Sequence, residues 1–269
     1  MGLFGLFAVA PFLILRLTGD DQDIHRIAWG FALYFALLWF VVLYALIAPE
    51  DRDWWRLGRI ALATAFAGTA IAIFLEKHIA PDDTSLVTMI LGVGLPEEFA
   101  KALAIYFFVF RSTRPSSTRT YLFAGAVSGL AFGAAEAVSY TQKFADLASY
   151  MSASSYTALV TWRLLTDSLL HAILAGICAY FIGLAYADSQ RRWALIGAGL
   201  GLAAVLHGAY DAWAANWAGT LTAAMIIFIF AGYVRSGDRI AERLVIGNPT
   251  DLPALSHQSG PESMSSPSG

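Results

Sequence analysis

Hydrophobic residues in this chain fall into long runs separated by short polar connections. A helix that crosses a bilayer needs about 20 mostly apolar residues. The pattern predicts about eight membrane-spanning helices, at 2–17, 27–48, 57–75, 86–110, 120–141, 161–187, 193–213 and 218–234. The first run is short and contains Pro11, so a re-entrant segment is the alternative there. The run lacks a basic n-region, so we expect a membrane segment rather than a cleaved signal peptide.

Polar residues dominate after the last hydrophobic run. The chain ends in "SHQSGPESMSSPSG", a composition that cannot bury a core. We therefore expect an all-α, polytopic membrane helix bundle over 1–235 and a disordered cytoplasmic tail over 236–269. The connection 142–160 is either an amphipathic segment on the membrane surface or a lid, and its sequence does not choose between the two.

Composition supports the membrane class. Hydrophobic residues make up 58% of the chain and charged residues 14%, with a mean hydropathy of +0.60, which is atypical of a soluble domain. The net charge is −3, and no basic patch points to nucleic acid as a partner. Cys178 is the single cysteine, so no disulfide forms within the chain and this residue is expected to be a packing residue.

Basic residues predict the orientation of the bundle, because cytoplasmic connections are enriched in Lys and Arg. Eleven arginines lie in the connections and tail on one side. They are Arg52, Arg56, Arg59, Arg111, Arg114, Arg119, Arg191, Arg192, Arg235, Arg239 and Arg243. The other side has only Arg26, Lys77 and Lys143. Both termini are therefore expected to be cytoplasmic.

Several ionisable residues lie inside the predicted spans, where a charge costs about 2.5–3.5 kcal/mol at the bilayer centre. Glu97 and Glu98 precede Lys101 by four and three residues, so one helix face can hold all three. The others are Glu136, Asp167, His171, His207 and Asp211, with Arg16 and Arg163 near span ends. So many costly residues call for one shared explanation.

Helical spacing indicates where these groups lie. Gly125, Gly129 and Gly133 form a ridge of small residues that allows close helix approach, which would bring Glu136 near a neighbouring backbone. His207 and Asp211 share a face. At about 1.5 Å per residue, the groups fall in the outer half of the bilayer. One water-filled cavity, open to the outside, could hold them all.

Carboxylates and imidazoles in such a cavity can activate water. A glutamate serves as general base, while histidines stabilise an oxyanion or ligate a metal together with a carboxylate. Spacing does not choose between these versions, and no HExxH motif is present. Two other classes of membrane protein could use the same residues. One is a proton- or cation-coupled transporter, and the other is a non-catalytic scaffold that binds through the glycine ridge.

Four segments resemble the motifs of the PrsW family of intramembrane proteases, which is related to the type II CAAX-processing membrane proteases. They are "PEEFAK", "FGAAE", "HAILAG" and "HGAYD", in family order and on separate spans within about 86–213, the expected catalytic core. The resemblance implies the catalytic residues Glu97, Glu98, Glu136, His171, His207 and Asp211. It implies supporting roles for Lys101, Phe132 and Asp167. If a metal such as zinc is bound, His171, His207, Glu98 and Glu136 are the implied ligands.

The resemblance also implies an activity and a location. It predicts a multi-pass endopeptidase of the bacterial plasma membrane that cleaves a membrane-anchored protein, such as an anti-sigma factor, near the outer half of the bilayer. It leaves open whether the enzyme is of the metallo- or the glutamic type, and which of Glu97 and Glu98 is the base.

Overall fold

Every regular element that the structure describes is helical. The computed structural model describes residues 24–79, 85–110, 116–148, 153–214 and 216–245. Its elements are α2 (Ile24–Ile47), α3 (Trp54–Ala63), η2 (Thr64–Gly68), α4 (Thr69–Ile79), α5 (Leu86–Thr88), η3 (Met89–Gly94), α6 (Leu95–Phe110), α7 (Thr118–Ala148), α8 (Ala153–Ala187), α9 (Arg192–Trp213) and α10 (Trp217–Val245). The prediction of an all-α, multi-pass membrane bundle is confirmed.

The helices coincide with seven of the predicted spans, and the first, 2–17, lies outside the described residues. Six helices of the described part are long and apolar enough to cross a membrane. The continuous segment Leu86–Phe110 is not among them, and it contains Glu97, Glu98 and Lys101. The count of eight spans and the cytoplasmic placement of both termini remain predictions.

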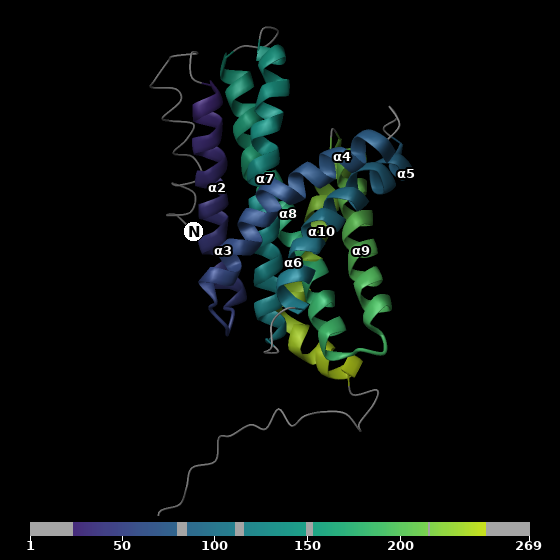
Figure 1. The fold of residues 1–269 in the computed structure, drawn as a ribbon. Coiled ribbons are helices and arrows are strands. Elements are labelled where there is room, and N and C mark those ends of the chain that lie inside the picture. Colours follow the sequence, from purple (N-terminus) through teal and green to yellow (C-terminus); the bar gives the residue numbers. More distant parts are fainter. Residues whose placement is uncertain (1–23, 80–84, 111–115, 149–152, 215, 246–269) are drawn as a thin grey trace, which may run out of the picture.

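The central layer of the bundle is the pair α7 and α8, which pack along their length (Figure 1). Helix α2 lies against this pair on one side, and α9 and α10 lie on the other. The segment α3–η2–α4 crosses the bundle obliquely in front. Buried apolar side chains such as Leu122, Phe123 and Ile173 join these helices into one core.

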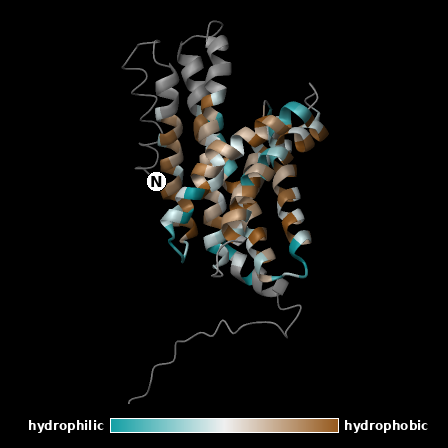
Figure 2. Ribbon diagram, in the orientation of Figure 1, coloured by the Kyte–Doolittle hydropathy of each residue, from teal (hydrophilic) through white to brown (hydrophobic). Residues whose placement is uncertain are grey.

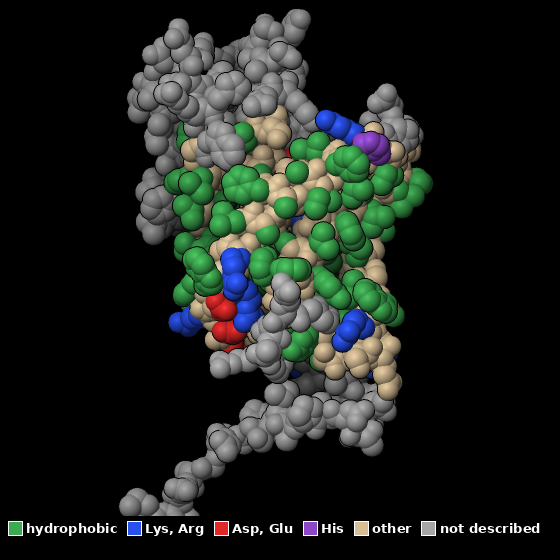
Figure 3. All heavy atoms as spheres, viewed as in Figure 1, with side chains coloured by type: hydrophobic (Ala, Val, Ile, Leu, Met, Phe, Trp, Pro, Cys, Tyr) green, Lys and Arg blue, Asp and Glu red, His purple; other side chains and the backbone are tan. Residues whose placement is uncertain are grey.

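The outer surface is suited to lipid. Hydrophobic residues run along the helices and cover most of the visible face (Figures 2 and 3). Large apolar side chains, including Phe66 and Phe228, are exposed on the surface of the molecule. Most of the Lys, Arg, Asp and Glu side chains on this face lie towards its lower end in Figure 3, and another basic side chain lies near the upper end beside a histidine. This distribution is typical of a membrane helix bundle.

The predicted glycine ridge is the contact between α7 and α8. A Cβ atom added at Gly125 or Gly129 would overlap the backbone carbonyl of Ala175 or of His171, respectively. At Gly133 it would lie 3.0 Å from both the His171 ring and the Ser168 Cα atom. Side chains are therefore excluded from this line of contact, and the two backbones approach closely.

A second close approach joins the start of α6 to α9. The segment η3 is a π-helical turn, in which the amide of Leu95 donates to the carbonyl of Ile90. Pro96 follows directly and lacks the N–H that would continue a regular α-helical ladder. A Cβ atom at Gly94 would meet the Ala204 carbonyl at 2.6 Å. The turn thus brings the first residues of α6 next to α9.

Helix α10 continues to Val245, so the prediction of a disordered tail from 236 is wrong for 236–245. These residues contain no proline, and the Tyr180 hydroxyl donates a 2.9 Å hydrogen bond to the carbonyl of Gly237. Residues 246–269 lie outside the described part. Most of the connection 142–160 is also helical, because α7 reaches Ala148 and α8 begins at Ala153.

Candidate active site

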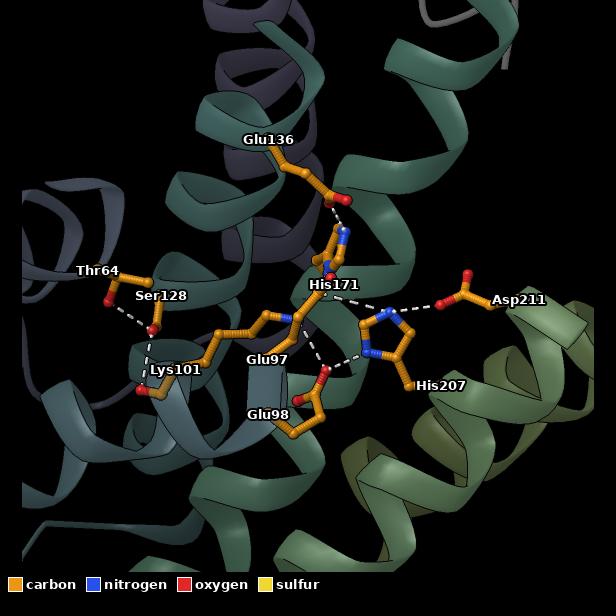
Figure 4. A network of polar contacts seen from close by, with 9 residues as sticks. All are labelled: Thr64, Glu97, Glu98, Lys101, Ser128, Glu136, His171, His207 and Asp211. Carbon is orange, nitrogen blue, oxygen red and sulfur yellow. Dashed lines mark hydrogen bonds and ion pairs between the residues drawn. The ribbon is translucent and has the colours of Figure 1, made fainter. Parts of the chain in front are cut away.

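The structure brings the ionisable side chains of four helices together inside the bundle (Figure 4). Helix α6 provides Glu97, Glu98 and Lys101, and α7 provides Glu136. Helix α8 provides His171, and α9 provides His207 and Asp211. Glu97, Glu98, Lys101 and both histidines are buried. The packing of α7 on α8 and of η3 on α9 sets this convergence.

Lys101 lies at the centre of the cluster. Its Nζ atom is 2.8 Å from Glu98 Oε1, 3.2 Å from Glu97 Oε2 and 2.7 Å from His171 Nδ1. The ammonium also lies 4.4 Å from the centre of the Phe132 ring, whose face attracts cations. Lys101 therefore balances part of the negative charge of the two glutamates.

His207 contacts three carboxylates. Its Nδ1 atom is 2.9 Å from Glu98 Oε1, within hydrogen-bond distance. Its Nε2 atom is 3.6 Å from Glu97 Oε2 and 3.4 Å from Asp211 Oδ2. With Nδ1 donating to Glu98, Nε2 is the nitrogen that faces Glu97 and Asp211.

His171 is held in a similar way by a different carboxylate. Its Nε2 atom is 2.7 Å from Glu136 Oε2, while its Nδ1 atom is 3.7 Å from Glu97 Oε2. Lys101 donates to Nδ1, so this nitrogen carries a lone pair and Nε2 carries the proton that Glu136 accepts. The rings of His171 and His207 lie 5.1 Å apart.

Glu97, His171 and His207 form the group that suits a metal ion. One donor atom from each lies within 4.8 Å of the other two. Two imidazoles and a carboxylate are a common donor set for catalytic zinc, whose tetrahedral geometry places ligands about 3.4 Å apart. Glu98 and Glu136 contact the opposite ring nitrogens, as carboxylates that orient ligating histidines do. The residues present thus fit a divalent metal, with Glu97 as the carboxylate ligand, if the Lys101 ammonium moves away from His171 Nδ1 to free its lone pair.

A small cavity adjoins the cluster between α7, α8 and α9. Its volume is about 20 Å³, enough for a water molecule. It is lined by Glu136, Arg163, Asp167, Leu170, His171, Leu174, His207, Tyr210 and Asp211. The side chains of Glu136 and Asp211 are 17% and 27% exposed, so these two carboxylates lie on the more open side of the cluster.

The remaining predicted residues have clear positions. Asp167 pairs with Arg163 at 2.7 Å and lines the cavity, away from Glu97. Phe132 lies beneath the Lys101 ammonium. Tyr210 also lines the cavity and was not predicted as a site residue. The signal for it was its place three residues after His207, on the same helix face.

A family model described as PrsW family intramembrane metalloprotease matches residues 52–234, about two thirds of the chain. The match includes every predicted site residue on α6, α7, α8 and α9. Comparisons with curated proteins and with solved structures gave no match.

Proposed function

Because the chain belongs to the PrsW family of intramembrane metalloproteases, we propose that it is an endopeptidase that hydrolyses a membrane-anchored protein within the bilayer. The observation that carries the proposal is the buried group of Glu97, His171 and His207, contributed by three different helices. Apolar side chains would pack at these positions as well or better, so packing alone does not explain why this group is buried.

In the proposed reaction, water enters through the adjoining cavity, which both histidines line, and reaches Glu97 beside them. Glu97 Oε2 is 3.6 Å from His207 Nε2 and 3.7 Å from His171 Nδ1, too far for strong direct hydrogen bonds. Glu97 accepts a proton from the water, whose oxygen attacks the scissile carbonyl carbon. The C–N bond then breaks, and the leaving amine takes the proton back from the Glu97 carboxyl group.

The other charged residues hold these groups in place. Glu98 and Glu136 orient His207 and His171 through contacts of 2.9 and 2.7 Å. The Lys101 ammonium stabilises the negative charge of Glu97, from 3.2 Å. We assign the role of base to Glu97 rather than Glu98, because Glu98 Oε1 is engaged by both Lys101 and His207 and its side chain is fully buried.

A divalent metal fits the same group. The cluster contains four carboxylates, of which Glu97 and Glu98 contact the Lys101 ammonium while Glu136 and Asp211 contact the histidines, so it favours an added cation. In this alternative, metal-dependent form of the reaction, Glu97, His171 and His207 would hold the ion, and zinc matches this donor set. Glu97 would then be a ligand in place of the base. When bound, it would supply Lewis-acid polarisation of the scissile carbonyl.

The location of cleavage is also part of the proposal. Glu136 lies just past the middle of α7 and Asp211 in the last turn of α9, two helices that begin beside the arginine-rich connections. With those connections in the cytoplasm of a bacterial cell, the cluster lies towards the outer half of the plasma membrane. A membrane-anchored anti-sigma factor that is cut near its outer end is a substrate that suits this position.

Reconstituted proteoliposomes containing a single-span substrate test the proposal. We expect Glu97→Gln to lower the rate of cleavage by about 10²–10⁴-fold, because an amide keeps the shape of the carboxylate but cannot accept the proton. Glu50→Gln is the matched control, since Glu50 is exposed in the connection before α3. A Glu97→Gln variant that cleaves at the wild-type rate would refute the assignment. Proton flux without cleavage by the wild type would favour a transporter.

A further inference from the structure

Two buried hydroxyl groups connect the oblique helix to the active-site cluster. Thr64 begins the π-helical turn η2, and Ser128 lies in α7. Their Oγ1 and Oγ atoms are 2.8 Å apart, and Ser128 Oγ is 3.3 Å from the backbone carbonyl oxygen of Lys101 (Figure 4). Both residues are fully buried. Neither belongs to the four motifs or to the group that suits a metal ion.

The direction of this chain of hydrogen bonds follows from its end point. A carbonyl oxygen only accepts, so the Ser128 hydroxyl donates to Lys101. The Ser128 oxygen is then free to accept the hydrogen of Thr64. The chain therefore runs from η2 through α7 to α6, and it ends on the backbone of the residue whose ammonium contacts Glu97 and Glu98.

Helix α7 contacts both the backbone and the side-chain end of Lys101. Ser128 and Phe132 are four residues apart and lie on one face of α7. Ser128 contacts the Lys101 carbonyl, and the Phe132 ring lies 4.4 Å from the Lys101 ammonium. The two contacts together set the position of Lys101 along and across α7, and within the described residues Ser128 is the polar side chain of α7 that bonds to the Lys101 backbone.

We propose that Thr64 and Ser128 are positioning residues that hold Lys101 so that its ammonium lies between Glu97, Glu98 and His171. The proposal rests on the proposed protease function for its effect on rate, but not for its effect on Lys101 itself. Loss of either hydroxyl leaves α6 free to shift relative to α7 and displaces the ammonium. A displacement of about 1 Å lowers catalytic rates by up to about 10²-fold.

Kinetics provide the first test. We expect Ser128→Ala and Thr64→Val to lower kcat by about 10–100-fold with little change in KM, and Thr64→Ser, which keeps the hydroxyl, to restore it. In a Lys101→Met background, Ser128→Ala should cause no further loss, because the group that it positions is absent. Thr222→Val is the matched control, since its buried hydroxyl bonds only within α10. Wild-type kcat in Ser128→Ala would overturn the proposal.

A second test does not require protease activity. The chain has three lysines, Lys77, Lys101 and Lys143, so a protein labelled with ¹⁵N at lysine Nζ gives few signals. The Lys101 signal is the one that Lys101→Met removes. We expect it to shift in Ser128→Ala and Thr64→Val but not in Thr64→Ser or Thr222→Val. A lower Tm with an unshifted Lys101 signal would show that the hydroxyls only stabilise packing, and would overturn the proposal even if the wild type cleaves no peptide.

Discussion

Replacing Lys101 by methionine tests whether the cluster depends on a buried ammonium. Methionine has a similar length and is tolerated in helices, but it removes the ammonium that lies 3.2 Å from Glu97 Oε2 and 2.8 Å from Glu98 Oε1. Two adjacent buried carboxylates then lack a counter-charge. We expect a less stable protein that cleaves substrate slowly, because repulsion between the two carboxylates displaces Glu97 from its place opposite the histidines.

The size of the effect follows from the distances. At an effective dielectric constant of about 20, contacts of 2.8 and 3.2 Å each correspond to about 5–6 kcal/mol of attraction. Desolvation of three charges offsets most of this, and removal of one partner from a buried pair typically costs about 3–5 kcal/mol. For a chain of this size, that loss lowers Tm by roughly 6–20 °C.

Tryptophan fluorescence during heating in detergent measures this change, and peptide cleavage measures activity. The double variant Lys101→Met, Glu98→Gln returns residues 97, 98 and 101 to their original net charge of −1, so we expect it to recover at least half of the lost stability but little activity. A Lys101→Met protein with wild-type Tm and wild-type cleavage would refute the role assigned to the ammonium. A double variant no more stable than Lys101→Met would show that packing, rather than charge, causes the loss.

Two further predictions concern the metal group and the glycine ridge. Glu136→Gln should weaken zinc or cobalt binding by about 10–100-fold in a calorimetric titration, because the amide carries no charge to hold the His171 ring; unchanged affinity would place Glu136 outside the metal site. Gly129→Ala should destabilise the protein by about 1–3 kcal/mol, since its Cβ meets the His171 carbonyl and forces α7 from α8. Gly197→Ala is the control, because the space at Gly197 is open, and an equal fall in Tm for both would refute the close contact.

The helices and the four polar motifs were predictable, because both depend on residues that are near in the sequence. The apolar runs end where polar connections begin, and Glu97, Glu98 and Lys101 share a face through helical periodicity alone. The glycine ridge was equally local. The spacing of the glycines did not predict that α8 packs against this ridge, because any neighbouring helix could have done so.

The contacts between helices could not be predicted from spacing. The pairing of Glu98 with His207, and of Glu136 with His171, depends on how each helix is rotated about its axis. Whether Glu97 or Glu98 faces both histidines depends on the same rotation. The Thr64–Ser128 contact has no motif, because two hydroxyls in separate apolar helices are common in membrane proteins.

The sequence alone therefore determined a membrane bundle of helices and the residues for which burial is too costly to be accidental, since insertion energies and helical periodicity act along the chain. Only the tertiary structure decided which nitrogen of each imidazole meets which carboxylate, and that Glu97 stands opposite both rings. Those distances depend on the close approach between α7 and α8 and between η3 and α9. Glycines at these contacts have no side chain, so the backbones can touch.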